Sequence, residues 1–150
     1  MRRLLPLLGA MVTAAAIAQG AQGEPSAAHP CTLISNKDVA RIVGPGGHVE
    51  VGGSTCRLHR GRPMVGVISI NADTRSRFLA FRRQIFAQSS RAENVPRLGQ
   101  LAFQSWYTRV PPYHYLFVLV NGNRLVVGSF KGSFTAGQAR RIAKIVARGI

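Results

Sequence analysis

The chain has 150 residues, 46% of them hydrophobic, with 20 Lys and Arg against 5 Asp and Glu and a formal net charge of +15. This length is typical of one small domain and not of a multidomain protein, and the apolar content is too high for a chain that is disordered throughout. So large an excess of basic residues predicts attraction to polyanions without specifying which polyanion.

The first 23 residues predict a signal peptide. Arg2 and Arg3 precede an apolar stretch over residues 4–17, and small residues follow it, so that cleavage after Ala18 or Gly23 is expected. A membrane anchor is the alternative. It is disfavoured because the interrupted stretch is shorter than the ~20 residues that a bilayer span requires, and no later stretch is long enough to span.

The composition of residues 24–30 predicts a flexible leader, and residues 31–150 predict a single domain. Its two cysteines, Cys31 and Cys56, predict one disulfide, because exported small domains form such pairs in an oxidising compartment. The alternative, which would give the two cysteines a chemical function, is a redox-active or metal-binding pair. The wide spacing and the absence of a second ligand pair disfavour it.

The first half of the domain predicts a helix, a hairpin and a second helix. Ser35 and Asp38 form a capping box for a helix that stops at Gly44, and strands follow over residues 55–59 and 64–70. The next helix starts after Asp73 or Thr74 and runs for about four turns. Its apolar positions recur at helical spacing, which predicts the main core helix more readily than a ligand site; they are Phe78, Phe81, Ile85 and Phe86.

The second half predicts a three-stranded meander and a last helix. The strands span residues 101–108, 113–120 and 124–130, and Asn121-Gly122-Asn123 makes a hairpin turn. Thr135 and Gln138 form a second capping box. The order of elements predicts an α+β fold with an antiparallel sheet of about five strands and helices packed mainly on one face.

Two helices carry clusters of basic residues. On the last helix the cluster forms a stripe opposite the apolar face, from which it can engage a phosphate-bearing chain or an anionic membrane surface. The alternative is that both clusters only keep the protein soluble. The predicted anion-binding residues are Arg140, Arg141, Lys144 and Arg148, followed by Arg75, Arg82 and Arg83, with Arg77 beside them.

Aromatic residues gather around one strand pair, where they would serve as stacking platforms for bases. They are Trp106, Tyr107, Tyr113, His114 and Tyr115. Half of the aromatics on a strand must face a core, however, and no helix-turn-helix or zinc-finger spacing is present. A specific nucleic-acid partner is therefore not expected.

The chemistry-bearing residues are few and scattered. Besides Glu24 in the leader, the carboxylates are Asp38, Glu50, Asp73 and Glu93, and the histidines are His29, His48, His59 and His114. His48 and His59 can meet across a strand, but two histidines alone are a weak metal signal. We expect no enzymatic activity, no cofactor and no metal, with a hydrolase as a distant third hypothesis.

The leading hypothesis is a secreted or periplasmic, non-enzymatic domain that binds an anionic envelope partner. This partner would be an anionic polymer or an anionic membrane surface. The alternative is a protein–protein interaction module of the envelope, which uses an edge strand or the aromatic strand pair.

Short motifs along the mature chain resemble a known group of proteins. Pro30-Cys31-Thr32-Leu33-Ile34-Ser35 opens a helix that ends at Gly44, Cys56 lies in the first strand, and Val95-Pro96-Arg97-Leu98-Gly99-Gln100-Leu101-Ala102 precedes another strand. The chain is similar in this to small exported bacterial domains of unknown function, known mainly as actinobacterial lipoproteins, with a Pro-Cys start and one disulfide. It departs from them in having no lipidation site, in Arg97 where glycine is usual, and in Gln100 where an acid is usual. The resemblance implies an α+β fold and a non-catalytic envelope role, and it transfers no catalytic residue.

Overall fold

The computed structural model describes residues 28–109, 113–130 and 133–150, and the expected signal peptide and most of the leader lie outside this part. In chain order the elements are the 3₁₀ helix η1 (Pro30–Thr32), α1 (Asn36–Val43), β1 (Gly47–Gly52), β2 (Thr55–Arg60), β3 (Met64–Ala72), α2 (Arg75–Gln88), β4 (Arg91–Asn94), β5 (Leu101–Trp106), β6 (His114–Val120), β7 (Asn123–Ser129) and α3 (Ala136–Ala147).

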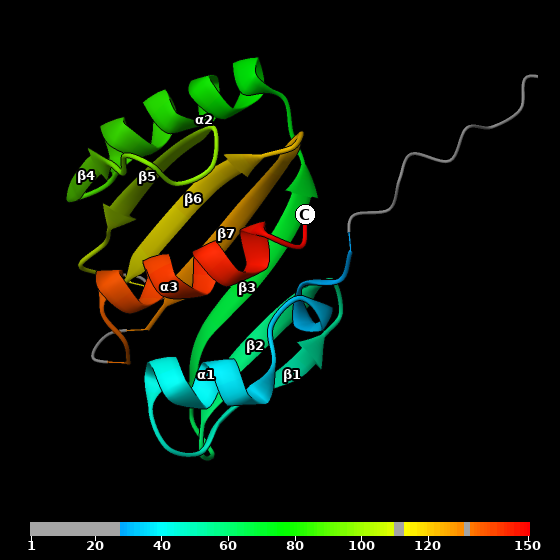
Figure 1. Ribbon diagram of the computed structural model, residues 1–150. Coiled ribbons are helices and arrows are strands. Elements are labelled where there is room, and N and C mark those ends of the chain that lie inside the picture. Colours follow the sequence, from blue (N-terminus) through cyan, green and yellow to red (C-terminus); the bar gives the residue numbers. More distant parts are fainter. Residues whose placement is uncertain (1–27, 110–112, 131–132) are drawn as a thin grey trace, which may run out of the picture.

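The strands form one antiparallel sheet in the order β1-β2-β3-β7-β6-β5-β4 (Figure 1). The α+β class is confirmed, but the expected number of about five strands is wrong, because the sheet has seven. β1 and β4 are the additional strands, and they form the two edges. β1 alternates between polar and apolar residues only over residues 48–51, inside a glycine-rich stretch, and β4 has only four residues, Arg-Ala-Glu-Asn, so the signal for a strand is weak in both.

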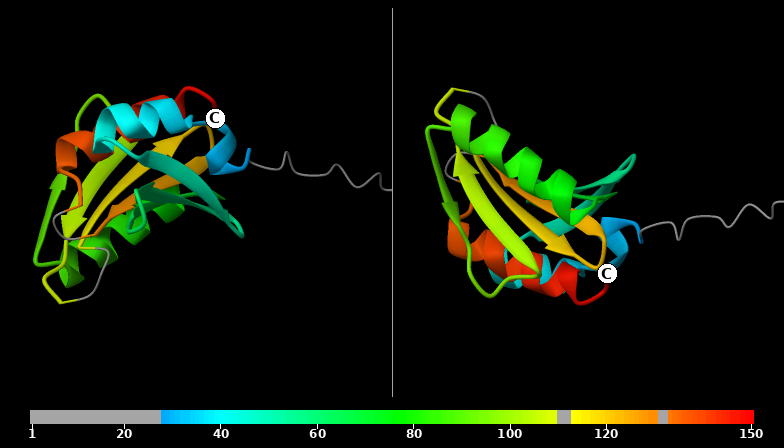
Figure 2. Two further views of the ribbon diagram at one scale, coloured as in Figure 1. Left: turned by 90° about the horizontal axis from the view of Figure 1, so that it is seen from below. Right: turned by 90° about the horizontal axis from the view of Figure 1, so that it is seen from above.

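The helices cover both faces of the sheet. Figure 2 shows α1 and α3 side by side on one face and α2 on the other. The prediction that the helices pack mainly on one face therefore holds for two of the three helices. The larger core cluster lies on the α1 and α3 side and includes Val39, Ile142 and Leu116. The smaller lies under α2 and includes Phe78, Phe103 and Phe117.

The helix expected to be the main core helix therefore covers the smaller core. Phe78 is the only fully buried residue of α2, and Phe86 stays 37% exposed. The reason is position, because α2 lies over β4 and β5 near one edge of the sheet, whereas α3 crosses the central strands β6 and β7.

The local signals at the element ends are confirmed. Ser35 and Asp38 form the capping box of α1, Thr135 and Gln138 form that of α3, and Thr74 caps α2. Asn121 and Gly122, with φ of 46° and 72°, make the turn between β6 and β7.

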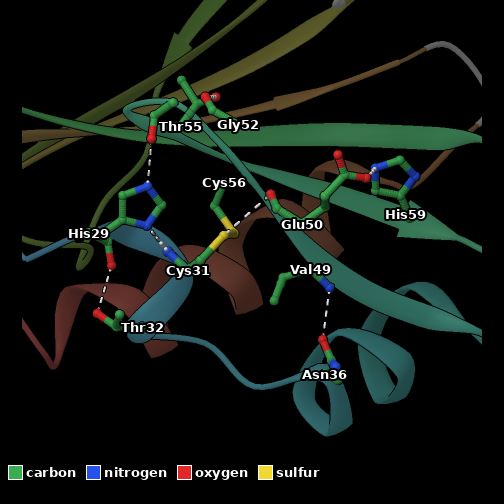
Figure 3. Close-up of a disulfide and its surroundings, with 11 residues drawn as sticks. His29, Cys31, Thr32, Asn36, Val49, Glu50, Gly52, Thr55, Cys56 and His59 are labelled. Carbon is green, nitrogen blue, oxygen red and sulfur yellow. Dashed lines mark hydrogen bonds and ion pairs between the residues drawn. A yellow bond between two sulfur atoms is a disulfide. The ribbon is translucent and has the colours of Figure 1, made fainter.

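The predicted disulfide is present and joins η1 to β2 (Figure 3). Cys31 and Cys56 are bonded with their Cα atoms 5.0 Å apart, and Cys56 is fully buried. His29 holds the backbone at Cys31 in place next to the disulfide. Its Nδ1 accepts from the Cys31 N–H at 3.2 Å, and its Nε2 lies 2.9 Å from the Gly53 carbonyl oxygen. Among the described residues, no helix combines the length and apolarity needed to cross a bilayer.

Candidate functional site

Each carboxylate in the described part of the chain lies against an arginine. The pairs are Asp38 with Arg41 at 2.5 Å, Glu50 with Arg57 at 3.2 Å, Asp73 with Arg124 at 3.5 Å, and Glu93 with Arg91 at 2.7 Å. The pKa of Asp38 is lowered, first by the hydrogen bond from the Ser35 hydroxyl, and that of Glu93 is lowered, first by the hydrogen bond from Arg91. The negative charges of the fold are therefore neutralised locally, and the excess positive charge stays on other side chains.

The stripe predicted on the last helix separates into two environments. Arg141 and Lys144 of α3 and the helical C-cap residue Arg148 are exposed and, at 100° per residue, lie within an arc of roughly 60° over about 10 Å. We call these three residues the α3 stripe. No carboxylate among the described residues pairs with any of them.

Arg140 differs from the other three. Its side chain is 41% exposed, and one of its terminal nitrogens lies 3.8 Å from the Glu93 Oε1 atom on β4. Its Nε atom is buried without a hydrogen-bond partner. Arg140 therefore turns from the solvent-facing stripe toward the sheet, where it neutralises Glu93 together with Arg91.

The second basic cluster lies on α2. Arg75, Arg77 and Arg83 are exposed, but they point roughly 80° to 160° apart around the helix and form no common stripe. Arg82 is half-buried, with its guanidinium carbon 5.3 Å from the centre of the Phe86 ring. Because α2 and α3 lie on opposite faces of the sheet (Figure 2), the two clusters form two surfaces and not one.

A groove of about 500 Å³ runs between α2 and the loop that joins β4 to β5. Phe78 and Arg82 line it from α2, and residues 94–102 line it from the loop and the start of β5. Phe78, Val95 and Leu98 are buried apolar residues of its wall. The charged residues among those that line it are Arg82 and Arg97.

A chain of polar side chains crosses the sheet beneath the start of α3. Gln104 donates from Nε2 to Glu93 Oε1 at 2.5 Å, and its Oε1 lies 3.2 Å from His114 Nε2, which is therefore the protonated ring nitrogen. Ser129 Oγ lies 3.5 Å from the remaining nitrogen, Nδ1, which can only accept. Burial lowers the pKa of His114 to about 4, so the imidazole is neutral at pH 7.

A small cavity of about 240 Å³ adjoins this chain, lined among others by Trp106, His114, Ser129 and Phe134. His114 is 5% and Ser129 2% exposed. A serine and a neutral histidine are thus adjacent, at a place where the sequence predicts no catalytic group. Their burial and the 3.5 Å separation match a structural hydrogen bond at the edge of the core more closely than a nucleophile with access to substrate.

The aromatic residues considered as stacking platforms lie on two faces. Trp106 and His114 pack together with ring centres 5.1 Å apart, and the guanidinium carbon of Arg91 lies 4.6 Å from the centre of the Trp106 ring. On the other face Tyr107 contacts Tyr115, whose pKa is raised by burial. These residues therefore do not form one stacking surface.

His48 and His59 do meet, as opposite residues of β1 and β2 with ring centres 5.0 Å apart. His59 Nε2 lies 3.3 Å from Glu50 Oε2 (Figure 3). Within the described ranges, however, no three histidine, cysteine or acidic side chains come together in an arrangement suited to a metal ion.

Comparison with protein-family models, with curated proteins and with solved structures found no match. The candidate sites thus rest on geometry and charge alone. Of these, the α3 stripe consists of predicted anion-binding residues, and the groove contains another of them, Arg82; the groove wall formed by residues 94–102 was not indicated by the basic clusters. The residues that could have indicated this wall in the sequence are Arg97 and Gly99, in the short loop that joins β4 to β5.

Proposed function

We propose that this is an exported, non-enzymatic domain that binds an anionic polymer of the cell envelope through the α3 stripe. The observation that carries the proposal is the division of charge. The four described carboxylates are all paired with arginines elsewhere, while Arg141, Lys144 and Arg148 project from one side of α3 with no such partner. An anionic chain lying along the helix can replace the counterions of all three together.

A polymer suits this surface better than a membrane does. Helices that bind in the membrane interface expose apolar side chains beside their basic ones. The apolar face of α3, which includes Ile142 and Val146, is buried in the core, and the large exposed hydrophobic residues are Val51, Met64 and Phe86 on other elements. The α3 stripe therefore offers charge without an apolar anchor.

The protein-interaction alternative receives less support from the sheet edges. The Gly47 N–H on β1 donates to the Gly44 carbonyl at 3.1 Å. The Val49 N–H on the same strand donates to Asn36 Oδ1 at 2.8 Å (Figure 3). The opposite edge, β4, is four residues long and carries the Arg91–Glu93 ion pair. Short, charged or covered edges are protected against pairing with another strand.

The test is retention on immobilised heparin. We expect the mature protein to be retained at about 50 mM salt and released by about 500 mM, because binding through counterion release weakens with salt. The triple variant R141Q/K144Q/R148Q is expected to lose at least about tenfold in affinity at low salt.

The matched control is R75Q/R77Q/R83Q, which removes the same charge from α2 on the other face. It is expected to lose less than about threefold, because those residues form no common stripe. Equal losses in the two variants, or retention independent of salt, would show that the α3 stripe is not the binding site.

A further inference from the structure

The groove between α2 and residues 94–102 combines an apolar wall with unpaired arginines. Phe78, Val95 and Leu98 supply the wall, each with 5% or less of its surface exposed. Its volume of about 500 Å³ lies within the range of roughly 300 to 1,000 Å³ that is typical of small-molecule sites. Neither Arg82 nor Arg97 contacts a carboxylate in the described ranges.

The loop wall of the groove is held in place at both ends. The Val95 N–H donates to the Ala102 carbonyl at 2.9 Å, and the Gln100 N–H donates to the Leu119 carbonyl at 2.8 Å. Gly99 has a φ of 60°, and a Cβ atom there would lie 2.6 Å from the Leu119 oxygen. The groove is therefore preformed, and a ligand need not order the loop on binding.

Arg97 occupies an unfavourable backbone conformation within this loop. Its φ is 60°, in the left-handed region that glycine adopts without strain but that is strained for a residue with a Cβ atom. The strained backbone places a long cationic side chain on the groove, opposite Arg82 of α2. Strain at a ligand-facing position is a common feature of binding sites.

We propose that this groove binds an amphipathic anion, with the apolar body of the ligand against Phe78 and Leu98 and its carboxylate or phosphate against Arg82 and Arg97. The hydrocarbon of the ligand gains by leaving water for this wall, and the half-buried Arg82 and the exposed Arg97 gain from charge-assisted hydrogen bonds to an oxyanion. This site uses residues distinct from the α3 stripe, and the inference therefore goes beyond the proposed function.

The experiment titrates the mature protein with octanoate, with 1-octanol and with acetate by calorimetry. Octanol keeps the hydrocarbon without the charge, and acetate keeps the charge without the hydrocarbon. We expect octanoate to bind at one site at least about tenfold more tightly than octanol, and acetate to bind more weakly still. Octyl phosphate in place of octanoate then separates a preference for phosphate from one for carboxylate. Octanoate binding no tighter than that of octanol or of acetate would overturn the proposal.

Variants locate the site. R82Q/R97Q is expected to reduce octanoate affinity at least about tenfold, whereas R77Q/R83Q, which removes the same charge from the exposed sides of α2, is expected to change it less than about twofold. Equal effects of the two variants would overturn the assignment. Heparin retention is expected to stay within about twofold in R82Q/R97Q, so the failures of the two proposals can be distinguished.

R97G separates a ligand role from a structural one. Glycine adopts the φ of 60° without strain, so the melting temperature is expected to rise while octanoate affinity falls. An octanoate affinity unchanged in R97G would exclude Arg97 from the site.

Discussion

At the scale of single residues, His114 is the titratable group that burial perturbs most strongly. Its pKa is lowered to about 4 from an ordinary value of 6.5, and its orientation is set by Gln104 on one side and Ser129 on the other. The unfolded chain binds a proton at this histidine below pH 6.5, whereas the folded protein does so only near pH 4.

The folded state is therefore expected to lose stability as pH falls from 6.5 to 4, by about 3 kcal/mol from this group, with the full contribution present above pH 6.5. Urea unfolding at a series of pH values measures this loss. In H114Q the side chain stays neutral, so the loss over that window should be much smaller. Parallel curves for the two proteins would contradict the role of His114.

Two glycines are required by close contact with neighbouring chain. A Cβ atom at Gly47 would lie 2.7 Å from the backbone of Ala40 in α1, and one at Gly66 would lie 2.5 Å from the Gly128 carbonyl oxygen. We expect G47A to lower the free energy of unfolding by about 1 to 3 kcal/mol, because backbone must move. G137A, where the nearest atom is 3.7 Å away, should instead stabilise α3 by up to about 1 kcal/mol. Denaturant unfolding of both variants checks the contrast.

At the scale of elements, Gln138 connects the two helices on one face. Its Oε1 accepts from the Thr135 N–H in the capping box, and its Nε2 donates to the Ile42 carbonyl near the end of α1. One side chain thus caps the start of α3 and satisfies a carbonyl that α1 leaves free at its C-terminal end.

Q138A is therefore expected to cost more than S35A, although both remove part of a capping box. S35A should lower the free energy of unfolding by about 1 kcal/mol, and Q138A by roughly 2 kcal/mol, because the Ile42 carbonyl also loses its partner. Chemical denaturation measures both. A smaller effect in Q138A than in S35A would show that the α1–α3 bridge contributes little.

At the scale of the whole molecule, the disulfide joins η1 to the start of β2. Cys31 and Cys56 are 25 residues apart. The double variant C31S/C56S is expected to lose about 3 to 4 kcal/mol of stability in the chain-entropy model, a large share for a domain of this size. Thermal unfolding with and without a reductant gives the same comparison in the wild-type protein, and a melting temperature unchanged by reduction would contradict it.

Much of the local structure was predictable from the sequence because its causes are local. The capping boxes at Ser35 and Thr135 and the Asn121-Gly122 turn depend on residues within three or four positions of one another. The strands near the middle of the sheet were found for a similar reason, since a buried strand such as β6 is a continuous apolar run.

The rest was decided by contacts between distant parts of the chain. β4, with the sequence Arg-Ala-Glu-Asn, is a strand because β5 supplies its hydrogen-bond partners, and nothing within these four residues indicates this. On a helical wheel Arg140 lies on the same side of the helix as the other basic residues. In the structure, however, its side chain turns away from the solvent-facing stripe toward Glu93 on β4. The groove at Arg82 and Arg97 exists because α2 and the β4–β5 loop meet in space.

The amino-acid sequence by itself determined the α+β class, the disulfide, the ends of the helices and the sign of the charge, since propensity, capping, cysteine count and composition are properties of short segments. Only the tertiary structure decided that α2 and α3 lie on opposite faces, that seven strands pair, and which arginines stay without a carboxylate partner. Each of these depends on which segments pack together, and packing is settled by the burial of surface across the entire chain.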